Sequence, residues 1–86
     1  MDRAEILEKL KEIILETDQD NVLNDSMITE DSELIRDLGL DSFKMIFAAV
    51  MIETRMNCRI DNEKYKRIKT VGDVIDLICN ATMKIL

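Results

Sequence analysis

The chain has 86 residues, a formal net charge of −6 and no histidine. This length allows one small domain, which we take to be residues 1–86. The lack of histidine excludes histidine-based acid–base catalysis and histidine-ligated zinc. The acidity argues against nucleic acid as a partner. Residues 1–41 hold 13 acidic and 4 basic side chains, so the net acidity lies almost entirely before Ser42.

Cysteine usage and hydropathy indicate the compartment. Cys58 and Cys79 lack a CxxC spacing and are expected to be free, buried, small apolar residues in a reducing environment. The charged N-terminus does not fit a signal peptide, and the longest apolar run, residues 46–52, is too short to span a bilayer. The sequence therefore predicts a soluble, cytoplasmic monomer with no membrane partner.

Residues 3–16 are predicted to form an amphipathic helix. Apolar side chains recur at helical spacing and charged side chains occupy the other face. The apolar positions are Ile6, Leu7, Leu10, Ile13, Ile14 and Leu15.

Residues 17–41 form a long polar connection, which a compact domain must hold in place. Its apolar residues are expected to pin it to the core. These residues are Val22, Leu23, Met27 and Ile28. Later in the connection, the spacing of Leu34 and Leu38 predicts a helical turn, which Gly39 would end in the left-handed region.

The aspartates of this connection do not predict a metal site. If an EF-hand loop began at Asp18, its required glycine position would be Leu23 and its bidentate glutamate position would be Thr29. We therefore expect no calcium or other metal site.

Residues 42–56 are predicted to form the second helix, with Asp41 or Ser42 as its N-cap. This helix is apolar nearly all round, and so small a bundle cannot bury it completely. One stripe is expected in the core: Met45, Ala48, Ala49, Ile52 and Met56. The other is expected at the surface: Phe43, Ile46, Phe47, Val50 and Thr54. Two choices stay open for this helix. Phe47 either belongs to the exposed stripe or packs against the long loop. The small side chains of Ala48 and Ala49 either leave a dry cavity between the helices or allow the helices to pack closely.

Two more helices complete the predicted fold. A short one runs from Asp61 to about Lys66, with Tyr65 as an apolar anchor. Thr70 and Asp73 form a capping-box pattern at the start of the last helix. Its apolar stripe is expected to continue to the C-terminus through Val71, Val74, Ile75, Ile78, Thr82 and Ile85. The fold class is therefore all-α: a small four-helix bundle of three longer helices and one short one, with a long loop after the first helix.

The string Leu38-Gly39-Leu40-Asp41-Ser42-Phe43 is the strongest candidate for a functional site. It places a hydroxyl on the first turn of a helix. The first backbone N–H groups of a helix lack internal partners and favour an anionic group nearby. A phosphate ester on Ser42 would therefore be stabilised at this point.

From Leu34 to Ile78 the chain resembles the acyl carrier protein family. The resemblance rests on Leu34-Ile35-Arg36-Asp37-Leu38-Gly39-Leu40-Asp41-Ser42, on Ile60-Asp61 and on Lys69-Thr70-Val71-Gly72-Asp73-Val74-Ile75. It implies that a phosphopantetheinyl transferase attaches 4'-phosphopantetheine from coenzyme A to Ser42, beside the helix cap Asp41. It also implies a carrier rather than an enzyme. The carrier would present acyl thioesters to acyl-loading, condensing or transferring enzymes of fatty acid, polyketide or related biosynthesis.

The second helix departs from the pattern of fatty acid carriers, in which it is usually acidic. Lys44 and Phe47 stand at positions that are often acidic there, and only Glu53 keeps an acidic position. We therefore expect a specialised carrier with a partly apolar partner face. That face comprises Phe43, Lys44, Ile46, Phe47, Val50 and Glu53.

Two other functions remain open. The first is a peptidyl or aminoacyl carrier, although such carriers usually have glycine where this chain has Leu40. The second is a helical protein-interaction module without a prosthetic group, which would bind a partner helix on the exposed apolar stripe.

Overall fold

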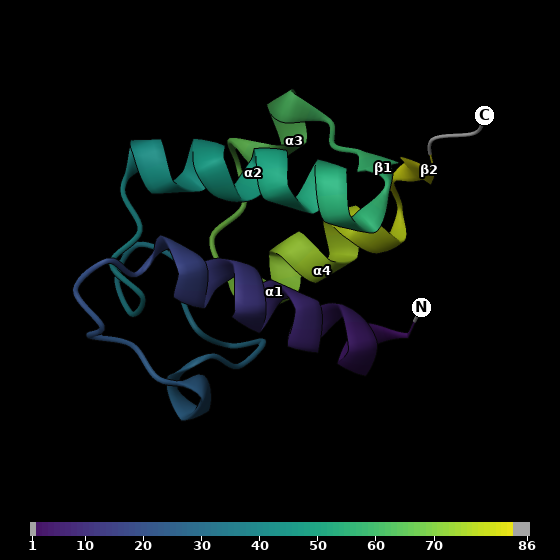
Figure 1. The fold of residues 1–86 in the computed structure, drawn as a ribbon. Coiled ribbons are helices and arrows are strands. Elements are labelled where there is room, and N and C mark those ends of the chain that lie inside the picture. The colour runs from purple at the N-terminus through teal and green to yellow at the C-terminus, as the bar shows by residue number, and fades with distance from the viewer. Residues whose placement is uncertain (1, 84–86) are drawn as a thin grey trace.

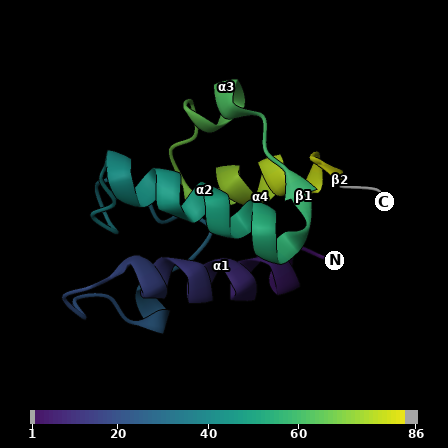
Figure 2. The ribbon, with the colours of Figure 1, turned by 45° about the horizontal axis from the view of Figure 1, so that its top comes forward.

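The computed structural model describes residues 2–83, and Figure 1 shows its helices and the long loop that follows the first of them. In chain order the elements are α1 (Arg3–Thr17), the 3-10 turn η1 (Asp25–Met27), α2 (Ser42–Met56), β1 (Cys58–Arg59), α3 (Asn62–Tyr65), α4 (Val71–Cys79) and β2 (Thr82–Met83). Figures 1 and 2 place α1 and α3 on opposite sides of α2. The predicted all-α class and the order of the helices are confirmed. No helix within residues 2–83 is long and apolar enough to cross a membrane.

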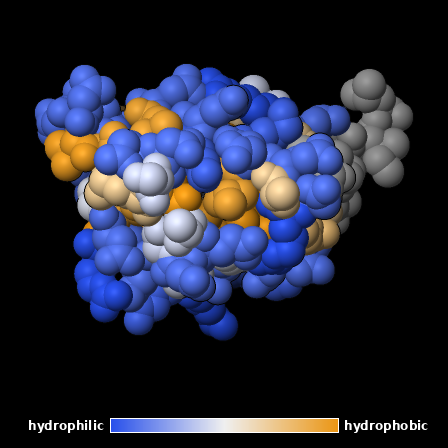
Figure 3. Space-filling model, turned by 90° about the horizontal axis from the view of Figure 1, so that it is seen from below, coloured by the Kyte–Doolittle hydropathy of each residue, from blue (hydrophilic) through white to orange (hydrophobic). Residues whose placement is uncertain are grey.

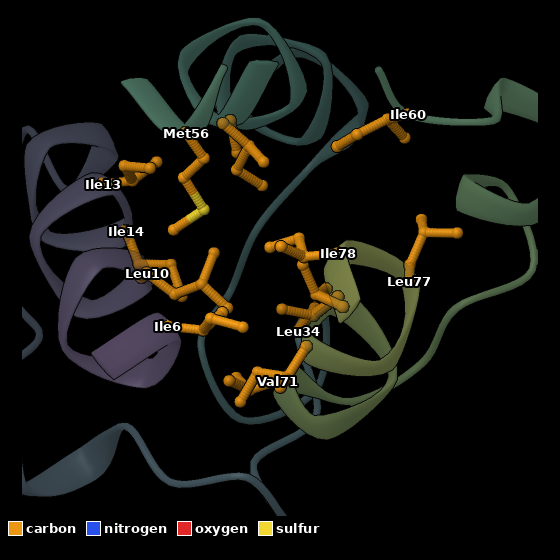
Figure 4. Packing of buried hydrophobic residues seen from close by; sticks show 14 of the residues in the cluster. Ile6, Leu10, Ile13, Ile14, Leu34, Met56, Ile60, Val71, Leu77 and Ile78 are labelled. Carbon is orange, nitrogen blue, oxygen red and sulfur yellow. The ribbon is translucent and has the colours of Figure 1, made fainter. Parts of the chain in front are cut away.

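The core fills the space between α1, α2 and α4, as Figure 4 shows. Side chains from α1 and α4 point toward one another, and Met56 of α2 reaches between them. The buried face of α1 follows the predicted spacing, with Ile6, Leu10 and Ile13 at most 2% exposed. Of the stripe predicted to lie in the core, Ala48, Ile52 and Met56 are buried, whereas Met45 and Ala49 are half-buried.

The long loop between α1 and α2 is held by backbone hydrogen bonds to the start of α4. The Leu34 amide donates to Lys69 O at 2.9 Å, and the Gly72 amide donates to Glu30 O at 2.8 Å. A Cβ atom on Gly72 would lie 3.0 Å from Glu30 O, so this close approach favours glycine. The Arg3 guanidinium contacts both Glu30 and Asp76 at 2.5 Å, which joins α1, the loop and α4.

Only half of the predicted apolar anchors of this loop lie in the core. Ile28 is buried and Leu23 packs against the core, as expected, but Val22 and Met27 are exposed. Polar contacts hold the loop instead: the buried Ser32 Oγ donates to Met27 O at 2.8 Å. Such a network satisfies backbone groups that an apolar anchor would leave unpaired.

The last helix is shorter than predicted. Its N-terminal capping box between Thr70 and Asp73 is present as expected, but α4 ends at Cys79 rather than continuing to the C-terminus. The Asn80 side chain donates to Asp76 O at 2.8 Å and so closes the helix end. Thr82 then pairs with Arg59, in the antiparallel ladder of β1 and β2. The remaining member of the predicted stripe, Ile85, lies outside the described residues.

The two cysteines differ in environment. Neither forms a disulfide within the described residues, but Cys58 is buried whereas Cys79 is exposed. The prediction that both are buried is therefore wrong for Cys79. As the last residue of α4, it lies beside the apolar stripe of that helix rather than on it.

Candidate functional site

The start of α2 is fixed by the turn that precedes it. Leu34, Leu38 and Leu40 are buried, and the Leu40 amide donates to Leu34 O at 3.0 Å. Gly39 between them has a φ of +67°, the left-handed conformation predicted from the sequence. Three buried leucines therefore hold the chain immediately before α2 against the core.

Asp41 is the N-cap of α2. Its side chain accepts a hydrogen bond from the Lys44 amide at 2.8 Å, and its carbonyl accepts one from the Met45 amide at 2.9 Å. This resolves the choice of cap that the sequence left open, and it places Ser42 in the first helical position.

The Ser42 side chain is exposed and has no hydrogen-bond partner within the part of the chain that the structure describes. An exposed hydroxyl on a rigid helix start is accessible to a modifying enzyme. A phosphate ester there would lie beside the positive end of the α2 dipole. The site therefore fits the attachment of a phosphate-linked group.

An exposed apolar strip begins at the residue after Ser42. Phe43 is 76% exposed, Ile46 65%, Phe47 41% and Val50 55%, as the apolar pattern of this helix predicted. Phe47 is the most covered of the four because the end of α1 lies beside it. Lys44 is half-buried near this strip. The surface seen from below is mainly hydrophilic, with hydrophobic patches at the left end and across the middle of this face (Figure 3).

Glu53, the acidic residue of the predicted partner face, has a partner within the chain. Its Oε2 accepts a hydrogen bond from the Ile60 amide at 3.0 Å, and the side chain is half-buried. The carboxylate thereby holds the segment between β1 and α3 against α2. The sequence did not indicate this contact, because the two groups are seven residues apart across a non-helical turn.

Tyr65 is the expected anchor of α3, and it also makes a hydrogen bond that the sequence did not indicate. Its hydroxyl donates to Met45 O at 2.7 Å, which attaches α3 to the first half of α2. Burial raises the pKa of Tyr65 to about 12.

On the other side of α2, an ion pair joins it to α1. Arg55 Nη2 donates to Glu16 Oε1 at 2.8 Å. This hydrogen bond lowers the pKa of the Glu16 carboxyl below its ordinary value, despite some opposing desolvation. Ion pairs of this exposure contribute little to stability, but they fix which way a side chain points.

The interior behind α2 is closely packed. The cavity lined by Leu40, Met45, Ala48 and Tyr65, among others, has a volume of about 10 Å³. This is about the space for one water molecule. Of the two alternatives for Ala48, close helix packing is the one found.

Comparisons with known proteins agree with this geometry. The family model described as a phosphopantetheine attachment site matches residues 5–78. An acyl carrier protein from Clostridium perfringens is 38% identical over 79 residues, covering 92% of this chain and 100% of its own length. One from Coprothermobacter proteolyticus is 35% identical over 78 residues, covering 91% of this chain and 92% of its own.

A solved structure of a candidate acyl carrier protein from Mycobacterium tuberculosis has the same fold. It superposes with a TM-score of 0.75 at 28% identity, covering 86% of this chain and 95% of its own. These matches favour a carrier over an interaction module without a prosthetic group, which the exposed strip taken alone also fitted. The chain belongs to the acyl carrier protein family, the phosphopantetheine-bearing carriers.

Proposed function

We propose that Ser42 is the residue to which 4'-phosphopantetheine is attached. The observation that carries this proposal is the exposed, unpartnered hydroxyl on the first turn of α2, directly after the N-cap Asp41. Ser26 and Ser32 lack that setting, because Ser26 lies in the 3-10 turn and Ser32 is buried in a hydrogen-bonded loop.

The chain contributes position rather than catalysis to this attachment. The Ser42 oxygen would form a bond to phosphorus as the phosphorus–oxygen bond to the nucleotide half of coenzyme A breaks and the hydroxyl proton leaves. A separate transferase would supply the catalytic groups. Asp41 keeps α2 formed up to Ser42, so the hydroxyl is presented on an ordered helix end. When bound, the prosthetic group supplies a thiol that holds the acyl chain as a thioester.

Intact-mass measurement tests this assignment. The protein is incubated with coenzyme A and a broad-specificity phosphopantetheinyl transferase. We expect the mass to rise by one phosphopantetheine, and Ser42→Ala to show no rise. Ser26→Ala serves as the matched control and should be modified like the wild type. A modified Ser42→Ala protein would contradict the proposal.

We further propose acyl cargo rather than aminoacyl cargo. The relatives named above are acyl carrier proteins, and Leu40 occupies a position where peptidyl carriers usually have glycine. Leu40 is only 3% exposed, so its side chain is part of the core beneath the site rather than a free surface group.

We also propose that partner enzymes dock on the apolar strip Phe43, Ile46, Phe47 and Val50. These side chains are exposed and begin one residue from Ser42. Desolvating one large apolar side chain contributes roughly 1.5–3 kcal/mol. An exposed ion pair contributes about 0–1 kcal/mol and is weakened by salt. Apolar contact should therefore dominate docking. Glu53 is left out of this face, because its carboxylate already accepts from the Ile60 amide.

A charge placed in the strip tests this face. Phe47→Glu should weaken binding to the enzyme that loads or condenses this carrier's cargo. Val22→Glu, which adds the same charge at an exposed loop position, should not. Binding should change little between low and moderate salt. A steep loss of affinity with salt, together with an unchanged affinity of Phe47→Glu, would show that charge elsewhere recruits the partner.

A further inference from the structure

A surface groove lies between the end of α1 and the first turns of α2. Its volume of about 440 Å³ falls within the roughly 300–1,000 Å³ that is typical of ligand pockets. Phe43, Lys44 and Phe47 line it from α2, whereas Thr17 and Gln19 line it from the end of α1 and the loop that follows. Because Phe43 and Phe47 also belong to the apolar strip, a protein that covers the strip also covers this groove.

Two aromatic rings form the apolar wall of the groove. Phe43 and Phe47 are four residues apart, so they lie next to each other on one face of α2. Both rings are exposed, Phe43 more than Phe47. Aromatic rings prefer stacked or edge-to-face contacts, which add to the gain from removing apolar area from water. The wall therefore suits a third aromatic ring.

Lys44 supplies the groove with a cation that has no partner. Its side chain is half-buried, and its ammonium makes no ion pair or hydrogen bond within residues 2–83. The two carboxylates of the groove are already engaged: Glu16 accepts from Arg55 at 2.8 Å, and Asp41 accepts from the Lys44 amide at 2.8 Å. An ammonium is attracted to the face of an aromatic ring, most strongly to that of tryptophan. This attraction favours an aromatic occupant over an aliphatic one.

We propose that this groove receives an aromatic side chain, a tryptophan or a tyrosine, of the partner enzyme that docks on the apolar strip. The ring lies against Phe43 and Phe47, with the Lys44 ammonium at its face. This inference rests on the proposed docking of partners on the strip, and it names the anchor of that docking. A few aromatic anchors seated in pockets often supply most of the binding free energy of an interface.

A pair of small probes tests the chemistry of the groove. N-acetyltryptophan amide represents the anchor, and N-acetylleucine amide is its aliphatic counterpart. Each probe is titrated into the ¹⁵N-labelled protein while the backbone amide shifts are followed. We expect the tryptophan probe to shift the amides of Thr17, Gln19 and Phe43 and to give nuclear Overhauser effects to both phenylalanine rings. The leucine probe should require higher concentrations.

Three variants separate the ammonium, the aromatic wall and the rest of the strip. Lys44→Met keeps the length of the side chain but removes the charge, so it should weaken binding of the tryptophan probe about two- to fivefold. It should not weaken binding of the leucine probe. Phe47→Ala removes part of the wall and should weaken both. Val50→Ala is the matched control, because Val50 is exposed on the strip but lies outside the groove wall, and it should bind both probes like the wild type.

Equal affinity of Lys44→Met and the wild type for the tryptophan probe would overturn the proposal, and so would shifts confined to the amides of Ile46 and Val50. Lys44→Met should also bind the enzyme that loads or condenses the cargo more weakly than the wild type does. If only the probe is affected, the groove takes small aromatic molecules and is not a docking anchor. Failure of the strip itself is recognised separately, since Phe47→Glu would then bind that enzyme like the wild type.

Discussion

Asp41 can serve the site in two ways: by capping α2, or by presenting a negative charge to the transferase. Replacing it by alanine and by asparagine separates the two. In the structure its carboxylate accepts the Lys44 amide at 2.8 Å and caps α2. Loss of an N-cap side chain costs about 0.5–2 kcal/mol, typically about 1. For a domain of this size, 1 kcal/mol corresponds to roughly 4–8 °C in melting temperature. We therefore expect Asp41→Ala to melt about 5 °C below the wild type when unfolding is followed by circular dichroism.

Asp41→Asn is the informative control, since asparagine caps about as well as aspartate but carries no charge. We expect it to stay within a few tenths of a kcal/mol of the wild type. If Asp41 acts on Ser42 only by ordering the helix start, Asp41→Asn should also be modified by the transferase at the wild-type rate. Equal melting temperatures for wild type and Asp41→Ala would refute the capping argument. A stable Asp41→Asn that is modified much more slowly would show that the transferase reads the charge.

The remaining predictions concern residues around the site. Tyr65 is the only tyrosine, so a tyrosinate absorbance titration should give an apparent pKa of about 12 in the folded protein and about 10 in denaturant. Because the pKa of Tyr65 is higher in the folded state than in the unfolded state, its contribution to the free energy of unfolding is fully present below pH 10. This contribution is lost as the pH rises toward 12, and Tyr65→Phe should not show that loss. Glu53→Ala should lower the free energy of unfolding, measured by chemical denaturation, by about 1–3 kcal/mol because it leaves the Ile60 amide unpaired. Glu53→Gln should lower it less because its amide oxygen can still accept this hydrogen bond, and equal losses for the two variants would contradict this role of Glu53. A thiol reagent should find two thiols under denaturing, non-reducing conditions, but in the native protein Cys79 should react promptly and Cys58 only on opening; equal native rates would contradict the assigned burial.

The local elements of this protein could be predicted from its sequence. The apolar spacing of Ile6, Leu10 and Ile13 determines the buried face of α1 because helical periodicity is a local property. The cap at Asp41, the left-handed Gly39 and the capping box at Thr70 also depend on a few neighbouring residues. The candidate attachment residue follows from the same short segment, and so does the exposed strip that begins after it.

Contacts between distant segments were decided only by the tertiary structure. The pairing of Thr82 with Arg59 after the end of α4 joins segments that are far apart in the sequence, and no local pattern around Thr82 indicates it. The hydrogen bond of Tyr65 to Met45 O and the use of Glu53 by the Ile60 amide join groups that become neighbours only when the helices pack. The close packing behind α2 arises in the same way, because the space between helices is set by how whole elements fit together rather than by any one of them.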